Sequence, residues 1–129
     1  MKIKTISNQD LHPTLQQFLD YVCQSPNLSK TVEDCARYLC IGPRQLRRIC
    51  KQHLNLSPSE IMKTVLVNYA QQQLNQPYRS VKMIAYELGF SDSSNFSTYF
   101  KRTVGVSPKF YRKQVIQQEM SDLQMEMSE

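Results

Sequence analysis

The chain has 129 residues, 16 Lys and Arg against 11 Asp and Glu, a formal net charge of +5, and 40% hydrophobic residues with only three Gly and six Pro. This length suits one compact domain or two small ones, and the composition excludes wholesale disorder and a collagen-like chain. No apolar run approaches the roughly 20 residues that span a bilayer, and the N-terminus lacks the apolar stretch of a secretory signal. We therefore expect a cytoplasmic protein with no membrane association.

The net charge is unevenly distributed along the chain. Residues 114–129 contain four acidic side chains and no Lys or Arg, so residues 1–113 carry 16 basic and 7 acidic side chains, a net of +9. A basic body is typical of a protein that binds a polyanion, either nucleic acid or an anionic membrane. The alternative explanation of this net charge is a surface whose charges only keep the protein soluble.

An apolar pattern in the first half of the chain recurs in the second half. Val32, Ala36 and Leu39 recur 49 residues later as Val81, Ala85 and Leu88. Leu46, Cys50, Ser57 and Pro58 recur 50 residues later as Phe96, Phe100, Ser107 and Pro108. The change in offset predicts a one-residue length difference in the turn between the two sets. Repetition of this kind indicates two homologous units.

In chain order, His12-Pro13 is predicted to open a first helix, and each repeated unit then forms a helix, a tight turn and a second helix. In the first unit, a helix over 32–39 leads to Gly42-Pro43, an N-cap and first-turn pair. The next helix ends near Leu54 and is followed by Asn55, which tolerates the left-handed conformation at a helix end. In the second unit, a helix over 81–88 is followed by Gly89, a helix capped by Asp92, and a stop at Gly105. This order is helix-turn-helix geometry, with a generic helical bundle as the alternative.

The segment between the two units is predicted to form one long helix. It opens with a capping-box pattern at Ser57 and Glu60, and after Pro58 it has no Gly or Pro as far as Gln76. A helix of this length spans roughly 30 Å, close to the roughly 34 Å between successive major-groove faces of B-DNA. The predicted organisation is all-α: an N-terminal helix and first helix-turn-helix subdomain over 1–56, a linker helix over 57–76, a second helix-turn-helix subdomain over 77–113, and an acidic tail over 114–129 that is either disordered or a short helix.

The second helix of each unit carries the candidate DNA-binding residues. In the first unit the exposed positions are nearly all cationic, at Arg44, Gln45, Arg47, Arg48 and Lys51. Arginine can contact guanine O6 and N7 or a phosphate, and glutamine suits an adenine edge. In the second unit short polar side chains precede two cations, at Ser93, Ser94, Asn95, Ser97, Thr98, Lys101 and Arg102. We expect the first helix to supply more affinity and specificity, and the second more positioning through phosphates.

The cysteines and histidines do not form a recognisable catalytic or metal site. Cys23, Cys35 and Cys50 fall on apolar helix positions and are predicted to be core residues, while Cys40 falls in a turn. The spacing of the cysteines matches no standard zinc site, and His12 and His53 have no catalytic partners in sequence. We expect no enzymatic activity and no cofactor.

These residues resemble the AraC/XylS family of bacterial transcription regulators. The second unit carries the resemblance most closely, through the segments 84–85, 89–96, 100–101, 105–108 and 111–112, and the first unit resembles the family's first module through Ala36, Leu46, Arg48, Lys51, Ser57 and Pro58. The length is similar to that of the short, stand-alone members. The resemblance implies a domain of about seven helices whose two recognition helices enter adjacent major grooves of promoter DNA.

The resemblance further implies an activator that binds double-stranded promoter DNA as a monomer, contacts RNA polymerase and is associated with the nucleoid. Two alternatives stay open. The protein is a repressor or a competitor at such sites, or it is a protein-interaction module with reduced DNA binding, a reading that the acidic tail and the weakly charged second helix favour. A role of the tail in contacting a partner or screening the basic surface is a further hypothesis.

Overall fold

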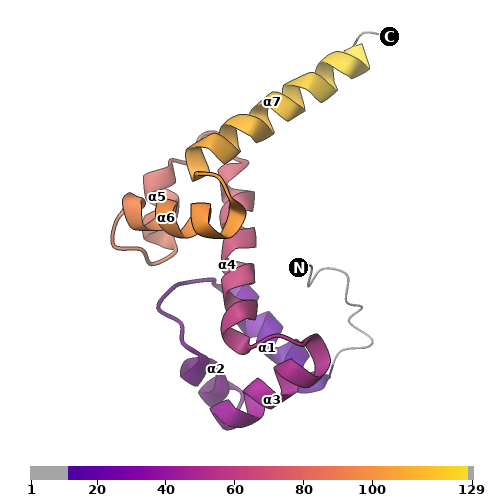
Figure 1. The fold of residues 1–129 in the computed structure, drawn as a ribbon, viewed down its shortest axis with the longest axis vertical. Coiled ribbons are helices and arrows are strands. Elements are labelled where there is room, and N and C mark those ends of the chain that lie inside the picture. The colour runs from indigo at the N-terminus through magenta and orange to yellow at the C-terminus, as the bar shows by residue number, and fades with distance from the viewer. Residues whose placement is uncertain (1–11, 128–129) are drawn as a thin grey trace. The chain divides into compact units, whose positions relative to one another are not determined.

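The computed structural model describes residues 12–127 and shows, over this range, seven α-helices and no strand (Figure 1). The helices are α1 (Pro13–Gln24), α2 (Val32–Tyr38), α3 (Pro43–Leu54), α4 (Pro58–Leu74), α5 (Val81–Glu87), α6 (Ser93–Val104) and α7 (Pro108–Met127). The prediction of an all-α fold with about seven helices is confirmed. The chain divides into two compact units between Leu66 and Val67, a point inside α4. The finer subdomain boundaries given above stay a prediction.

The core of the first unit is formed by α1, α2, α3 and the first half of α4. Its most deeply buried side chains are those of Leu15, Phe18, Leu46, Cys50 and Ile61. On α3, Ile49 and Cys50 lie three and four positions after Leu46, so the buried residues share a single face of that helix. The opposite face of α3 is thereby left to solvent, and its position is held by the packing of the core.

The helix ends in the first unit follow the expected capping chemistry. His12 caps α1, with its Nδ1 accepting a hydrogen bond from the Thr14 N–H at 3.2 Å, and Pro13 occupies the first helical position. Ser57 and Glu60 form the predicted capping box, in which each side chain accepts a hydrogen bond from the backbone N–H of the other. Asn55 ends α3 in the left-handed conformation with φ 56°. These caps satisfy helix-end groups that would otherwise depend on water.

The tight turn has the same backbone hydrogen bonds in both units. The N–H of Cys40 donates to the Arg37 carbonyl, and the N–H of Gly89 donates to the Tyr86 carbonyl at the equivalent place. Both residues have positive φ, 60° for Cys40 and 92° for Gly89. The next helix has Gly42 as its N-cap in the first unit and Asp92 in the second. The predicted one-residue length difference is therefore confirmed, with Ser91 as the additional residue.

The second unit is built around aromatic side chains. Phe90 and Phe96 contact edge to face with ring centroids 5.3 Å apart, and Phe100 contacts Tyr111 of α7 at 5.6 Å. Phe96 and Phe100 are fully buried on one face of α6. Because these rings fill the space between α5, α6 and the start of α7, the other face of α6 is exposed.

Arg112 joins three segments of the second unit. Its guanidinium donates to the carbonyl oxygens of Leu74 at 2.9 Å and Gln76 at 3.3 Å, and also to that of Arg79. These carbonyls belong to the end of α4 and to the turn that leads into α5. One side chain from α7 thus satisfies acceptors that the end of α4 leaves without helical partners.

The cysteines divide into two buried and two exposed residues. Cys35 and Cys50 are core residues as predicted, and burial raises the pKa of the Cys50 thiol to about 11. The prediction that Cys23 is a core residue is wrong, because it lies at the exposed edge of α1 near the end of that helix. Cys40 is exposed, as its place in a turn suggested.

Across the residues that the structure describes, no helix combines the length and the apolar character needed to cross a membrane.

Candidate nucleic-acid interface

The exposed face of α3 presents the cationic row that the sequence predicted. Leu46, Ile49 and Cys50 are buried, which turns the remaining positions of the helix outward. The exposed side chains include every candidate on this helix, namely Arg44, Gln45, Arg47, Arg48 and Lys51. The structure therefore brings these five residues together on one solvent-facing surface.

The sequence reasoning missed one acidic neighbour of this row. Glu33, in the first turn of α2, has its Oε1 3.8 Å from Nη2 of Arg47. Both side chains are more than half exposed, so the pair is weak and screened by salt. No acidic residue lies on α3 itself, and the pair depends on α2 packing against α3. Only the three-dimensional arrangement shows that one arginine of the row has a competing carboxylate.

The start of α3 lacks a side-chain cap. Gly42 makes no side-chain hydrogen bond there, and Pro43 at the first helical position has no N–H. The first turn of α3 contains no acidic residue either. The helix N-terminus carries a partial positive charge, so this end adds to the attraction that the arginines exert on an anion.

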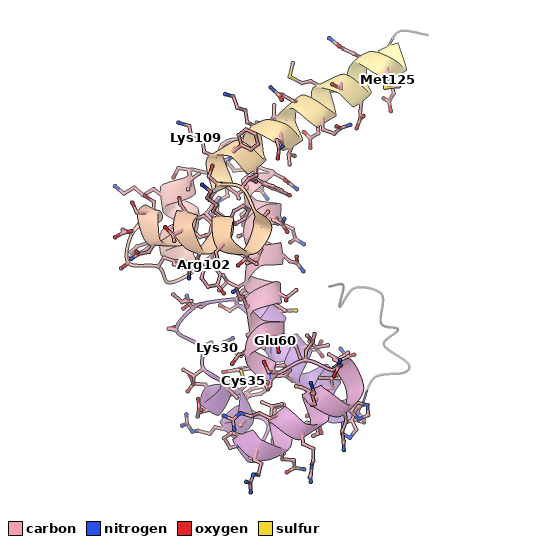
Figure 2. The ribbon with its side chains drawn as sticks, viewed as in Figure 1. Lys30, Cys35, Glu60, Arg102, Lys109 and Met125 are labelled. Atoms are coloured by element: carbon pink, nitrogen blue, oxygen red, sulfur yellow. The ribbon has the colours of Figure 1, made fainter. Side chains whose placement is uncertain are left out.

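The exposed face of α6 is polar, with cations only near its end. The N-cap is Asp92, whose carboxylate accepts from the Asn95 N–H at 2.8 Å, while the Asn95 side-chain amide donates to the Ser91 hydroxyl at 2.7 Å. The predicted site residues divide by exposure: Ser93 and Ser97 are half-buried, whereas Ser94, Asn95, Thr98, Lys101 and Arg102 are exposed. The structure brings them onto one helix, and Figure 2 shows Arg102 on that helix.

The two helix starts set the correspondence between the two candidate surfaces. The N-cap of α3 is Gly42 and that of α6 is Asp92, so each residue of α3 aligns with the residue of α6 that lies 50 positions later. The cationic row of α3 then corresponds, in order, to Ser94, Ser97, Thr98 and Lys101. The second surface therefore carries a cation at one of these four positions.

A mostly apolar groove of about 610 Å³ lies on the second unit, between α5 and the start of α6. Met83 and Tyr86 line it and are 61% and 83% exposed, and Phe90 forms its buried wall. Their counterparts in the first unit, at an offset of 49, are Asp34 and Arg37, which pair at 3.2 Å. No function was predicted for this surface, although the two repeats differ visibly here, with charged residues in the first and apolar residues in the second.

A polar network lies beside this groove. Arg79 donates hydrogen bonds to Gln73 and Glu87, and the Tyr69 hydroxyl donates to Glu87 at 2.7 Å. The Arg79 guanidinium, followed by the Tyr69 hydroxyl, lowers the pKa of the Glu87 carboxyl. Arg79 and Glu87 also line the groove, and through Tyr69 and Gln73 the network joins the last turns of α4 to α5.

Two helices with exposed polar and cationic faces, each preceded by a short helix and a tight turn, define a DNA-binding protein of the helix-turn-helix class. A family model described as a helix-turn-helix domain, of the AraC/XylS type, matches residues 35–114. The chain belongs to the AraC/XylS family of transcription regulators, and the predicted resemblance is confirmed.

The relatives support this assignment. The chain is 34% identical over 103 residues to the HTH-type transcriptional regulator ArgR of Pseudomonas aeruginosa, an alignment that covers 80% of this chain and 31% of ArgR. It is 33% identical over 114 residues to the HTH-type transcriptional activator RhaS of Yersinia pestis, covering 87% of this chain and 41% of RhaS. The chain thus spans less than half the length of these two relatives.

A solved structure shows the same fold. The DNA-binding domain of AdpA, described as a global transcriptional factor and solved in complex with a target DNA, superimposes with a TM-score of 0.70 and 23% identity. The match covers 80% of this chain and 93% of that one. By family and by fold, the described residues form an AraC-type helix-turn-helix domain.

Proposed function

We propose that this protein is a sequence-specific activator that binds double-stranded promoter DNA as a monomer at each site, through α3 and α6, and recruits RNA polymerase. The observation that carries the proposal is the row of four exposed cations on α3, at Arg44, Arg47, Arg48 and Lys51. Like charges this close repel one another, and a polyanion relieves the repulsion. The named activity of the Yersinia relative supports activation, and the AdpA complex supports DNA as the ligand.

In the proposed mechanism the two helices have different roles. The arginines of α3 contact base edges and phosphates and supply most of the specificity, because an arginine can bind guanine O6 and N7 with two hydrogen bonds. The short side chains of α6, Ser94, Asn95 and Thr98, approach the DNA closely, and Lys101 and Arg102 pair with phosphates. Counterion release from those phosphates makes the affinity fall steeply with salt. We place this activity in the cytoplasm, at the nucleoid.

The test begins with selection of bound sites from random duplexes, followed by titration of Arg48→Ala on the selected site and on a random duplex. Loss of a bidentate base contact costs about 1–3 kcal/mol on the selected site and less on the random one. Arg37→Ala is the matched control, because Arg37 is an exposed arginine of the same unit on α2 rather than α3. Equal losses on both duplexes would show that Arg48 reads only the backbone.

Activation is tested separately, by transcription with purified RNA polymerase from a promoter that carries the selected site. We expect more transcript when the protein is added. Reduced transcript identifies a repressor. Absence of any salt-sensitive DNA binding would contradict the proposal and favour the alternative of an interaction module.

A further inference from the structure

The outer half of α7 changes its character at about residue 116. In the first half, the inward row of the helix contains Pro108, Tyr111 and Val115, which are buried or half-buried. Continued at helical spacing, the same row becomes acidic at Glu119, Asp122 and Glu126. A helix face that changes from apolar to acidic leaves the domain surface at that point, and Figure 1 shows α7 extending beyond α5 and α6.

Every residue of α7 from 117 to 126 is exposed. Figure 2 shows Lys109 near the base of the helix and Met125 near its far end. In proteins most of the stability of a helix comes from packing of one of its faces rather than from the intrinsic propensity of its residues. A helical extension whose side chains are exposed along its length is therefore expected to gain stability from packing against another surface.

A second apolar row begins where the first one ends. Ile116, Met120 and Leu123 are separated by four and then three residues, the alternation that forms the seam of a two-helix coiled coil. Met120 and Leu123 are 59% and 57% exposed, and Ile116 is half-buried at the base. The preceding positions of the same register are Lys113 and Lys109, so the seam begins at Ile116 and does not extend further toward the domain.

The residues that flank this seam differ between its two sides. One flank carries Gln117 and Gln124, and the other carries Glu119 and Glu126. In a parallel pair of identical helices each flank faces the opposite flank of the partner, so Glu119 faces Gln124 of the second copy, whose amide can donate to the carboxylate. In an antiparallel pair like flanks face each other, and glutamate would face glutamate. Only the parallel arrangement of two identical helices pairs these flanks without repulsion.

We propose that the outer half of α7 forms a parallel pair with α7 of a second copy of this chain, along Ile116, Met120 and Leu123. The seam is short, so the pairing is weak in free solution. Two copies bound at neighbouring sites on one DNA have a high effective concentration, roughly millimolar for a short connection, and there the pairing produces cooperative binding. This last consequence rests on the proposed function, whereas the pairing itself does not.

The pairing is tested by sedimentation equilibrium of the full chain from micromolar to millimolar concentration. We expect a monomer–dimer equilibrium whose dissociation constant rises at least tenfold in Leu123→Glu. Met125→Glu is the matched control, because it introduces the same charge in place of an exposed apolar residue on the other side of α7, and we expect no comparable change. Leu123→Met keeps the seam apolar and should retain the dimer, which separates loss of packing from any general effect of substitution.

The parallel direction is tested by oxidative cross-linking of Leu123→Cys in a chain whose exposed Cys23 and Cys40 are replaced by Ser. Equivalent seam positions meet in a parallel pair, so a disulfide-linked dimer should form faster than in Met125→Cys. A wild-type chain that stays monomeric at millimolar concentration, or a dimer that Met125→Glu weakens as much as Leu123→Glu, overturns the pairing. A dimer that loses association in Leu123→Glu but does not cross-link through Leu123→Cys overturns the parallel direction. A dimer without DNA binding overturns the proposed function alone.

Discussion

Glu33 of α2 lies 3.8 Å from Arg47 of α3, and so places one carboxylate beside a row that is otherwise wholly cationic. The contact spans two helices of the first unit and is exposed to solvent. Any phosphate that approaches Arg47 has to compete with this carboxylate and is repelled by it. The pair therefore sets a limit on how strongly that arginine attracts DNA.

Replacing this carboxylate should strengthen DNA binding. Glu33→Gln leaves Arg47 unpaired and removes a negative charge near the phosphates, so we expect a rise in affinity of about two- to fivefold at low salt, shrinking as salt is added. Fluorescence anisotropy at several salt concentrations measures it. Asp20→Asn changes the net charge of the same unit equally from the exposed side of α1 and should have a smaller effect. Equal gains from both variants would mean that the effect is one of net charge.

The turn of the first unit contains a residue that its conformation does not favour. Cys40 has φ 60°, a left-handed conformation that costs a residue with a side chain roughly 1–2 kcal/mol, whereas its counterpart Gly89 adopts φ 92° without that cost. We expect Cys40→Gly to be neutral or stabilising by up to about 1 kcal/mol, because the greater freedom of glycine in the unfolded chain offsets part of the gain. Gly89→Ala should destabilise by about 1–2 kcal/mol. Urea unfolding measures both, and destabilisation by Cys40→Gly would contradict the argument.

Arg112 should be the most important charged residue for the stability of the second unit. Its three carbonyl acceptors lose their donor in Arg112→Met, which keeps much of the aliphatic bulk, so the loss reports on the hydrogen bonds. Hydrogen bonds to charged groups contribute about 1.5–3 kcal/mol each at most, and this half-buried group should cost about 2–4 kcal/mol in total. The exposed neighbour Lys113→Met is the control and should change the free energy of unfolding little. Similar losses for the two variants would show that Arg112 contributes only bulk.

The capping box of α4 should make the stability of the protein fall in acid. Hydrogen bonds from the backbone and side chain of Ser57 lower the pKa of Glu60 in the folded state. A carboxyl with a lowered folded pKa stabilises the protein fully above its unfolded pKa, and this contribution is lost as the pH falls through the folded value. The free energy of unfolding should therefore depend less on pH below about pH 5 in Glu60→Gln than in the wild type.

Ser57→Ala provides the graded comparison for this prediction. It removes the hydroxyl but keeps the backbone N–H of residue 57, which is the larger cause of the lowered pKa. The dependence of stability on pH should therefore lie between those of the wild type and Glu60→Gln. If all three chains lose stability in acid with the same slope, the capping box does not cause it.

The elements that the sequence predicted well are those whose signals are local. Gly42-Pro43, Asn55, Asp92 and Gly105 each act through their own backbone conformation or their own side chain, and each lies at the helix end that the pattern indicated. The burial of Leu46 and Phe96 followed from helical spacing and from the repeat. The candidate DNA-binding residues were predicted as those on the opposite, exposed face of the same helices.

The features that the sequence did not reveal depend on contacts between distant segments. Glu33 lies 14 positions before Arg47, and nothing in the spacing shows that α2 brings the two together. Cys23 lies at the edge of an otherwise apolar face, where periodicity alone does not separate buried from exposed. The acceptors of Arg112 lie more than 30 residues away. They are backbone carbonyls, which every residue type carries, so the sequence does not indicate them.

The N-termini of α3 and α6 differ in the charge that they present to an approaching anion, although the two helices occupy equivalent places in the duplicated fold. In α6 the carboxylate of Asp92 accepts a hydrogen bond from the Asn95 N–H and adds a negative charge. In α3 the N-cap provides no side-chain acceptor for the corresponding N–H, because Gly42 has no side chain. Gly42→Asp together with Asp92→Gly would therefore move this negative charge from the start of α6 to the start of α3 without changing a core residue.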